Sequence, residues 1–300
     1  MAPTADDERS SHDETGSLRG LRRKLAKLNR RALAEREGPP PPRPSPTPRE
    51  EGIVYRRDIP SVERRRVPAG GGICLPLEQC VEGREAGDGA GPPYYLIEQS
   101  VGQAGDGDGT SAALGQALDV LAERAEDVGF LDIETTGLGC SPVFLIGMLV
   151  FRDGAMVCRQ FLARHYAEEA SIVRRFARGM AEKPLLVTFN GKAFDVPYLR
   201  MRAAATGVAL GEPGDHFDLL HESRRVFGRR LPDCKLKTLE RYVCQRHRGD
   251  DIPGSDIPRA YHDFVRTGDA REIALIVKHN RWDLVTMVHL MSRLLAERRR

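Results

Sequence analysis

Two acidic residues close together in the sequence, Asp132 and Glu134, offer the clearest opportunity for chemistry. They lie in the β-like segment FLDIETT, and because strand side chains alternate, both carboxylates point to one face while Leu131 and Ile133 point to the other. Two carboxylates at the end of a buried strand repel each other and lose hydration unless cations neutralise them. The pair therefore indicates a site for a divalent metal ion, although an acidic pair at a strand end is also typical of an exposed edge.

A second polar group follows the apolar segment LLVTF, which predicts a buried strand at residues 185–189. The next residues include Asn190, Lys192 and Asp195, and loops beyond the carboxyl ends of parallel strands are where active-site groups collect. Each residue also has a simpler interpretation. Asp195 could cap the following helix, Asn190 could form a turn, and Lys192 could be solvated instead of meeting a phosphate.

The third group lies in KHNRWDLV, where His279 and Asp283 are four residues apart and so share one side of a predicted helix. They lie at the border of a broad apolar face, where an imidazole could polarise a water molecule bound to the same metal as the aspartate. A salt-linked surface pair is the alternative. The apolar face comprises Ile273, Ile276, Val277, Leu284, Met287 and Met291.

These groups occur in a fixed order: Asp-x-Glu on a strand, Asn-x-x-x-Phe-Asp after a buried strand, and His-x-x-x-Asp on a late helix. The order resembles the three exonuclease motifs of the DEDD superfamily, which has the ribonuclease-H-like fold. The resemblance covers residues 128–292 and extends faintly to VYRRDIP and YYLIE. It is similar above all to the bacterial YprB-like group in FLDIETTGL, TFNGKAFD, FDLLHESRR, LPDCKLKTLERY, DIPGSDIPRAY and HNRWD.

The resemblance implies a two-metal 3′ to 5′ exonuclease that hydrolyses phosphodiesters of DNA or RNA, with single-stranded 3′ ends as expected partners. His279 matches the residue that orients or deprotonates the attacking water. We expect contacts with the nucleic acid from Thr135, Asn190 and Lys192. Two Mg²⁺ or Mn²⁺ ions would be held by Asp132, Glu134, Asp195 and Asp283.

The third motif departs from the family pattern. The tyrosine subgroup has Tyr-x-x-x-Asp and the histidine subgroup usually has His-x-x-x-x-Asp, whereas this chain combines histidine with the tyrosine subgroup's spacing. Two alternatives therefore stay open: a catalytically inactive nucleic-acid-binding module, and a structure-specific endonuclease on the same fold. His289, further along the helix, is interpreted as an ordinary surface histidine without a role.

The elements that must position these residues follow an α/β pattern. FLDIETT, VFLIGMLVF and AMVCRQFLA predict three sequential strands in a meander. A helix at 167–182, the strand LLVTF and a helix that opens near Asp195 then form a βα crossover, followed by a short strand at 215–220. The remaining helices are predicted at 221–227, 236–245, 257–267 and 270–296. We therefore expect a mixed sheet of about five strands flanked by helices.

The region before this domain divides into two parts. Residues 1–50 predict a disordered tail that contains a proline-rich stretch and, at residues 18–37, a basic amphipathic helix. This helix could tether nucleic acid or a protein partner, or could simply be solvated. Residues 51–110 predict an irregular β-rich lead-in with the β-like pieces ICLPLEQ and YYLIEQS, packed on the main domain through residues 94–97.

The main domain is expected to cover residues 111–300 and to begin with a helix at 111–126. Residues 224–248 hold nine basic side chains against two acidic ones, with Phe227 and Tyr242 among them. This segment could neutralise phosphates and stack a base, or could be the solvated face of a helix. Asp218 could be an acid that supports the metal-binding residues or a plain strand-end residue, and we favour the latter. We interpret DDIPGSDIPRAY as a structured loop beside the cleft.

Composition neither supports nor excludes a nucleic-acid partner, but it indicates the cellular compartment in which the protein is expected. The 300 residues carry a formal charge of +3, which neither requires nor excludes a polyanionic partner. The six cysteines contain no two-residue spacing typical of zinc or redox motifs, so we expect free thiols in a reducing compartment. The longest apolar run, residues 143–151, is far shorter than the roughly 20 residues of a membrane span. Because the N-terminus also lacks an apolar signal core, we expect a cytoplasmic protein without membrane contact.

Overall fold

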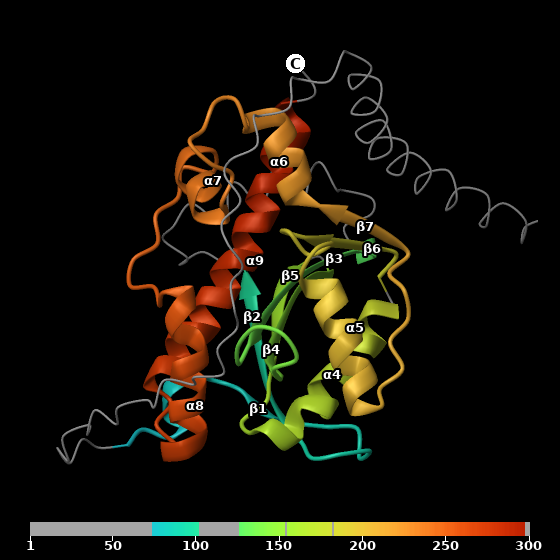
Figure 1. Cartoon of the computed structure of the whole chain (residues 1–300), viewed down its shortest axis with the longest axis vertical. Coiled ribbons are helices and arrows are strands. Elements are labelled where there is room, and N and C mark those ends of the chain that lie inside the picture. Colours follow the sequence, from blue (N-terminus) through green and yellow to red (C-terminus); the bar gives the residue numbers. More distant parts are fainter. Residues whose placement is uncertain (1–73, 102–125, 154, 182, 298–300) are drawn as a thin grey trace, which may run out of the picture. The chain divides into compact units, whose positions relative to one another are not determined.

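The structure is a computed structural model that describes residues 74–101, 126–153, 155–181 and 183–297 (Figure 1). The predicted tail at 1–50, with its basic helix, lies outside the described residues. So do residues 51–73 and nearly all of the helix predicted at 111–126.

A mixed seven-stranded sheet forms the centre of the described region, with the strand order β1-β2-β5-β4-β3-β6-β7. Pairing is antiparallel from β1 to β3 and parallel across β3, β6 and β7. This confirms the α/β class and the meander, while the predicted number of about five strands was too low. The strands are β1 (Arg84–Ala86), β2 (Tyr94–Val101), β3 (Val128–Thr135), β4 (Val143–Arg152), β5 (Ala155–Leu162), β6 (Leu185–Thr188) and β7 (Asp215–Asp218).

The two additional strands come from the lead-in. β2 pairs with β5 from Tyr95 to Val101, and residues 94–97 are buried, as their apolar side chains predicted. The prediction of a β-like piece at ICLPLEQ was wrong, because Leu77–Cys80 form the short helix α2. Pro76 immediately precedes this helix, and its fixed φ near −65° suits a helix start.

Both faces of the sheet are covered, which explains why β4 is buried at every position except its last. Neighbouring residues of β4 show the two layers. An added Cβ atom at Gly179 of α4 (Glu169–Ala181) would stand 3.6 Å from the sulfur of Met148, whereas an added Cβ atom at Gly147 would meet Asn280 of α9 (Arg271–Glu297). The helix α5 (Asp195–Thr206) follows β6 and packs with α4, while α9 crosses the other face (Figure 1).

Four further short helices connect the elements of the sheet and the helices α4, α8 (Ile257–Thr267) and α9. They are η2 (Tyr166–Glu168) before α4, α6 (Leu219–Phe227) after β7, α7 (Leu236–Tyr242) and η3 (Gly254–Asp256). The helix α7 ends earlier than the predicted 245, and Gln245 adopts a positive φ of 55° that a helix cannot contain.

The helix α8 (Ile257–Thr267) is fixed to the sheet by one aromatic residue. Tyr261 is fully buried, its ring stacks on Phe144 with 4.0 Å between centroids, and its hydroxyl donates to the carbonyl of Ala163 at 3.0 Å.

All six cysteines are free thiols. Within the described part of the chain, none of the helices has the length and apolar character needed to cross a membrane.

Candidate active site

Asp132 and Glu134 lie near the carboxyl end of β3, on the face that α9 covers. The residue paired with Asp132 on β4 is Gly147. A Cβ atom at Gly147 would stand 2.0 Å from Oδ1 of Asn280, so the missing side chain allows α9 to approach the sheet beside Asp132. Glycine at this point therefore serves close packing of the helix on the acidic strand.

Asn280 holds the carboxylate of Asp132 in place. Its Nδ2 donates to Oδ2 of Asp132 at 2.8 Å, and its Oδ1 accepts from Nε2 of Gln160 at 2.9 Å. Both Asn280 and Gln160 are fully buried, so the chain of hydrogen bonds is shielded from water. Asn280 was not predicted from the sequence, although a polar residue midway between Ile276 and Leu284 on an apolar helix face was a usable signal.

Asp195 is the first residue of α5, and Phe194 occupies the N-cap position without a side-chain cap. The interpretation of Asp195 as a helix cap was therefore wrong. Its side chain is buried, and burial, together with the charges of Asp218 and Asp283, raises its pKa to about 7 in spite of hydrogen bonds from backbone amides. A buried carboxyl group with a raised pKa is a typical feature of a functional site.

The structure brings the four predicted carboxylates into one region. Burial raises the pKa of Asp132 well above its ordinary value, and the charges of Asp283, Glu134 and Asp195 raise it further. Burial likewise raises the pKa of Glu134, followed by the charges of Asp283 and Asp195. Because each of these charges raises the pKa of its neighbours, the acids of β3, α5 and α9 lie close together in a poorly solvated region.

Asp283 and His279 have partners that the sequence did not reveal. Asp283 accepts a hydrogen bond through Oδ1 from Arg248, and its Oδ2 lies 3.5 Å from Nε2 of His279. The other ring nitrogen of His279, Nδ1, lies 2.6 Å from Oδ1 of Asp251. His279 is only 7% exposed, so the alternative of a salt-linked surface pair does not describe it.

The loop after β6 is organised by Asp218. This buried carboxylate accepts from the backbone amides of Asn190 at 2.9 Å and Lys192 at 3.0 Å, and also caps α6 by accepting from Leu220 at 3.0 Å. The interpretation of Asp218 as a plain strand-end residue was therefore wrong. Asn190 has a φ of 64°, in agreement with the turn role that was its alternative.

The three residues predicted to touch substrate have different surroundings. Lys192 has an exposed side chain, and Asn190 lies in the adjoining turn. The hydroxyl of Thr135 donates to the carbonyl of Gly137 at 2.8 Å, within the turn that follows β3. Substrate contact by these residues stays a prediction.

The basic segment 224–248 separates into buried and exposed parts. Phe227 is buried and cannot stack on a base, whereas Tyr242 is 56% exposed with the guanidinium of Arg241 5.5 Å from its ring centroid. Arg246 is buried.

His289 of α9 is also buried, so its interpretation as a surface histidine was wrong.

The chemistry of the acidic residues suits a hard cation. Mg²⁺ and Mn²⁺ prefer oxygen ligands, and a divalent ion would relieve the repulsion that raises the pKa values of these carboxyl groups. Within the described ranges, no three histidine, cysteine or acidic side chains stand in an arrangement that would hold a metal ion as they are. Metal binding is therefore a proposal based on the donor set.

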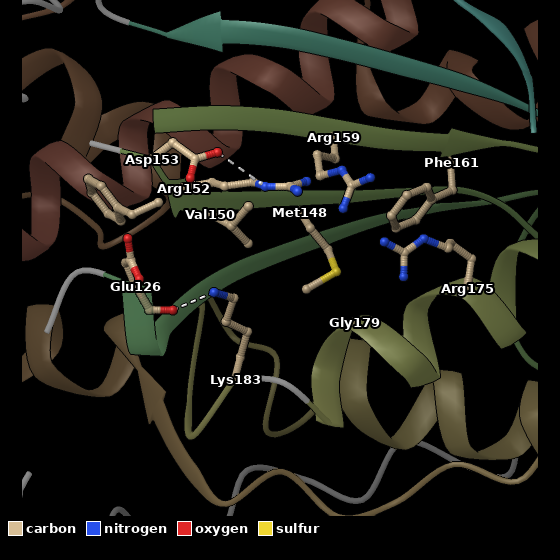
Figure 2. Close-up of a pocket in the computed structure, with 11 residues that line it drawn as sticks. Glu126, Met148, Val150, Arg152, Asp153, Arg159, Phe161, Arg175, Gly179 and Lys183 are labelled. Atoms are coloured by element: carbon tan, nitrogen blue, oxygen red, sulfur yellow. Dashed lines mark hydrogen bonds and ion pairs between the residues drawn. The ribbon is translucent and has the colours of Figure 1, made fainter. Parts of the chain in front are cut away.

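A separate pocket of about 410 Å³ lies on the α4 side of the sheet (Figure 2). Figure 2 shows Arg159 from β5 and Arg175 from α4 at its border; the guanidinium of Arg175 lies 5.4 Å from the ring centroid of Phe161. This pocket was not predicted from the sequence. It is lined by Glu126, Met148, Val150, Phe151, Arg152, Asp153, Arg159, Phe161, Arg175, Gly179 and Lys183.

Comparison with known proteins adds a family. Uncharacterized protein YprB of Bacillus subtilis (strain 168) is 27% identical over 195 residues, which cover 62% of this chain and 47% of that protein. The chain thus spans about half the length of this relative. A family B DNA polymerase from the hyperthermophilic archaeon Pyrobaculum calidifontis aligns with a TM-score of 0.46 and 22% identity over 56% of this chain and 24% of the polymerase. The family model of the RNase H superfamily matches residues 129–295, more than half of the chain, so the chain belongs to the RNase H superfamily and is a YprB-like member of it.

Proposed function

We propose that this protein is a metal-dependent nuclease, and specifically a 3′ to 5′ exonuclease that hydrolyses phosphodiesters of DNA or RNA. The observation that carries the proposal is the gathering of Asp132, Glu134, Asp195 and Asp283 in one poorly solvated region, where burial and neighbouring charge raise the pKa of the first three. The fold alone would not fix the reaction, so the acidic site decides.

In this proposal the four carboxylates would hold two Mg²⁺ or Mn²⁺ ions, which would supply charge neutralisation at the phosphate and a more acidic water molecule. The residues around them have supporting tasks. Asn280 fixes the orientation of Asp132, and Asp218 fixes the loop that precedes Asp195. His279, which lies beside Asp283, accepts the proton of the attacking water.

Two exposed side chains suit a nucleic-acid strand. Tyr242 presents an open ring with Arg241 beside it, and base stacking on such a ring is tolerant of sequence. Lys192 offers a positive charge in the loop that leads to Asp195, where it can pair with a backbone phosphate. The exposed ring favours a single-stranded substrate, because only an unpaired base can stack on it.

The test uses single strands of DNA and of RNA in two forms, incubated with Mg²⁺ or Mn²⁺. Linear strands carry a label at the 5′ end, and closed circular strands carry an internal label. A ladder that shortens from the 3′ end, together with intact circles, is the expected result. Asp195→Asn should abolish the ladder, while Asp250→Asn, at an exposed acid, should preserve it. Cleavage of circles would identify an endonuclease instead.

One observation favours the second candidate, a binding module without turnover. Arg248 already neutralises Asp283 through an ion pair, and a guanidinium fixed there competes with a metal ion for this carboxylate. Gel-shift binding of the same strands without any cleavage in Mg²⁺ or Mn²⁺ would establish this module and exclude the exonuclease.

A further inference from the structure

Asp251 lies beside His279 without belonging to the acidic motifs. It is part of the connection between α7 and α8, 28 residues before the histidine, and its Oδ1 lies 2.6 Å from Nδ1 of His279. Both side chains are largely shielded, with 11% and 9% of their surfaces exposed. A short contact between shielded groups is a directed interaction, in contrast to an exposed surface pair.

The contact determines which nitrogen of the ring carries hydrogen. Burial raises the pKa of Asp251, but hydrogen bonds from Lys237 and His279 outweigh it and hold the pKa below its ordinary value. An ionised carboxylate only accepts hydrogen bonds, so Nδ1 of His279 must be the donor. In the neutral ring, Nε2 is then the acceptor nitrogen, and it faces Asp283 at 3.5 Å.

Asp251 is itself held in place from two sides. Nζ of Lys237 lies 2.8 Å from its Oδ2, and Nη1 of Arg248 lies 3.6 Å from the same atom. Arg248 also reaches Glu240 at 2.5 Å, and Glu240 accepts from the hydroxyl of Thr286 on α9 at 3.0 Å. The residues that fix Asp251 are thus anchored to the helix that carries His279, which limits relative movement.

From this geometry we propose that Asp251 is the positioning residue of His279: it fixes the tautomer with hydrogen on Nδ1 and aims Nε2 at the acidic site. The inference rests on the proposed function, because a ring nitrogen aimed at Asp283 matters only if a reaction takes place there. It gives DDIPGSDIPRAY a task at the site through a residue that none of the acidic motifs contains.

The first measurement follows the ring directly. Full-length protein with ¹⁵N-labelled histidine is studied by long-range ¹H–¹⁵N NMR in Mg²⁺, at a pH at which the ring is neutral, and the signal of His279 is assigned by its loss in His279→Gln. The expected spectrum has a protonated Nδ1 and an unprotonated Nε2. Asp251→Ala should abolish this preference, while Asp250→Ala, at the exposed neighbour, should keep it. Asp251→Leu, which is similar in size and has no acceptor atom, replaces Asp251→Ala if that variant does not fold.

The second measurement is hydrolysis of a labelled strand. Asp251→Ala should lower kcat by about 10- to 100-fold with KM changed less than about twofold, and Asp251→Glu should recover part of the rate. A wild-type ring with hydrogen on Nε2, or an unchanged spectrum in whichever of Asp251→Ala and Asp251→Leu folds, would overturn the proposal. If the wild type shows the expected tautomer but cleaves nothing, the positioning stands and the proposed function fails.

Discussion

Acidic residues have pKa shifts of opposite direction at the acidic site and beside the pocket that Arg159 and Arg175 border. At the carboxyl end of β3, the pKa values of Asp132 and Glu134 are raised by burial and by neighbouring acids. Next to the pocket, burial also acts on Glu98, but hydrogen bonds and charges from Arg84 and Arg159 outweigh it and lower its pKa. Two of the protein's own arginines thus neutralise Glu98, whereas the charges that act on Asp132 and Glu134 come from other acids.

The largest expected effect comes from removing one charge in each region. Asp195→Asn should lower hydrolysis about 10³-fold or more, yet raise the free energy of unfolding of metal-free protein by on the order of 2 kcal/mol, because a buried repelling charge is lost. Glu98→Gln should instead lower it by about 1 kcal/mol, since two arginines lose their partner. Urea unfolding in EDTA measures both. A loss of stability in both variants would remove the contrast.

Divalent cations should stabilise only the acidic region. Mn²⁺ at about 100 times its dissociation constant should add about 2.7 kcal/mol to the free energy of unfolding, seen as a higher Tm that EDTA reverses. The rise should be greatly reduced in Asp195→Asn and unchanged in Glu98→Gln. An equal rise in all three proteins would place the bound ion elsewhere.

The two regions should also respond to pH with opposite sign. In metal-free protein, Asp195 has a pKa of about 7 against an ordinary value of 3.8. Between these values the folded chain keeps a proton that the unfolded chain has lost, so stability falls as pH rises and then levels off above about pH 7. Glu98 has a pKa below its ordinary value of 4.5, so it contributes stability that is present above pH 4.5 and is lost as the pH falls through the lowered pKa. Unfolding in EDTA from pH 5 to 8 should show a shallower decline for Asp195→Asn than for wild type.

The smallest effect is expected at the pocket. Arg175→Gln removes the contact of a guanidinium with the ring of Phe161 and should cost about 0.5 to 1 kcal/mol. The Mn²⁺-dependent rise in Tm and the rate of hydrolysis should not change. A loss of hydrolysis in this variant would show that the pocket and the acidic site are coupled.

Local sequence patterns were sufficient for much of the fold. Alternation in FLDIETT placed Asp132 and Glu134 on one face, and the helical period of the last helix placed its apolar residues in the core. The prediction failed where the number of neighbours matters. His289 is buried, and α9 packs against α6 and α7 as well as against the sheet. One helical period predicts a single apolar face and does not reveal a second neighbour.

The parts of the site that were missed depend on contacts distant in sequence. Asn280 meets Asp132 across 148 positions and Gln160 across 120. Asp251 meets His279 only because α7, its following loop and α9 pack together. Asp218 resembles any strand-end acid until the loop from β6 folds onto it. No spacing rule along the chain encodes these meetings.

Gly147 also sets the axial position of a long helix. Asn280 occupies the space that any side chain at 147 would fill, so α9 packs closely on β4 where Asn280 lies over Gly147. Sliding the helix by one turn would shift it by about 5.4 Å and carry both His279 and Asp283 away from the acids of β3. A single hydrogen atom in place of a side chain thus determines where all 27 residues of α9 lie along the sheet.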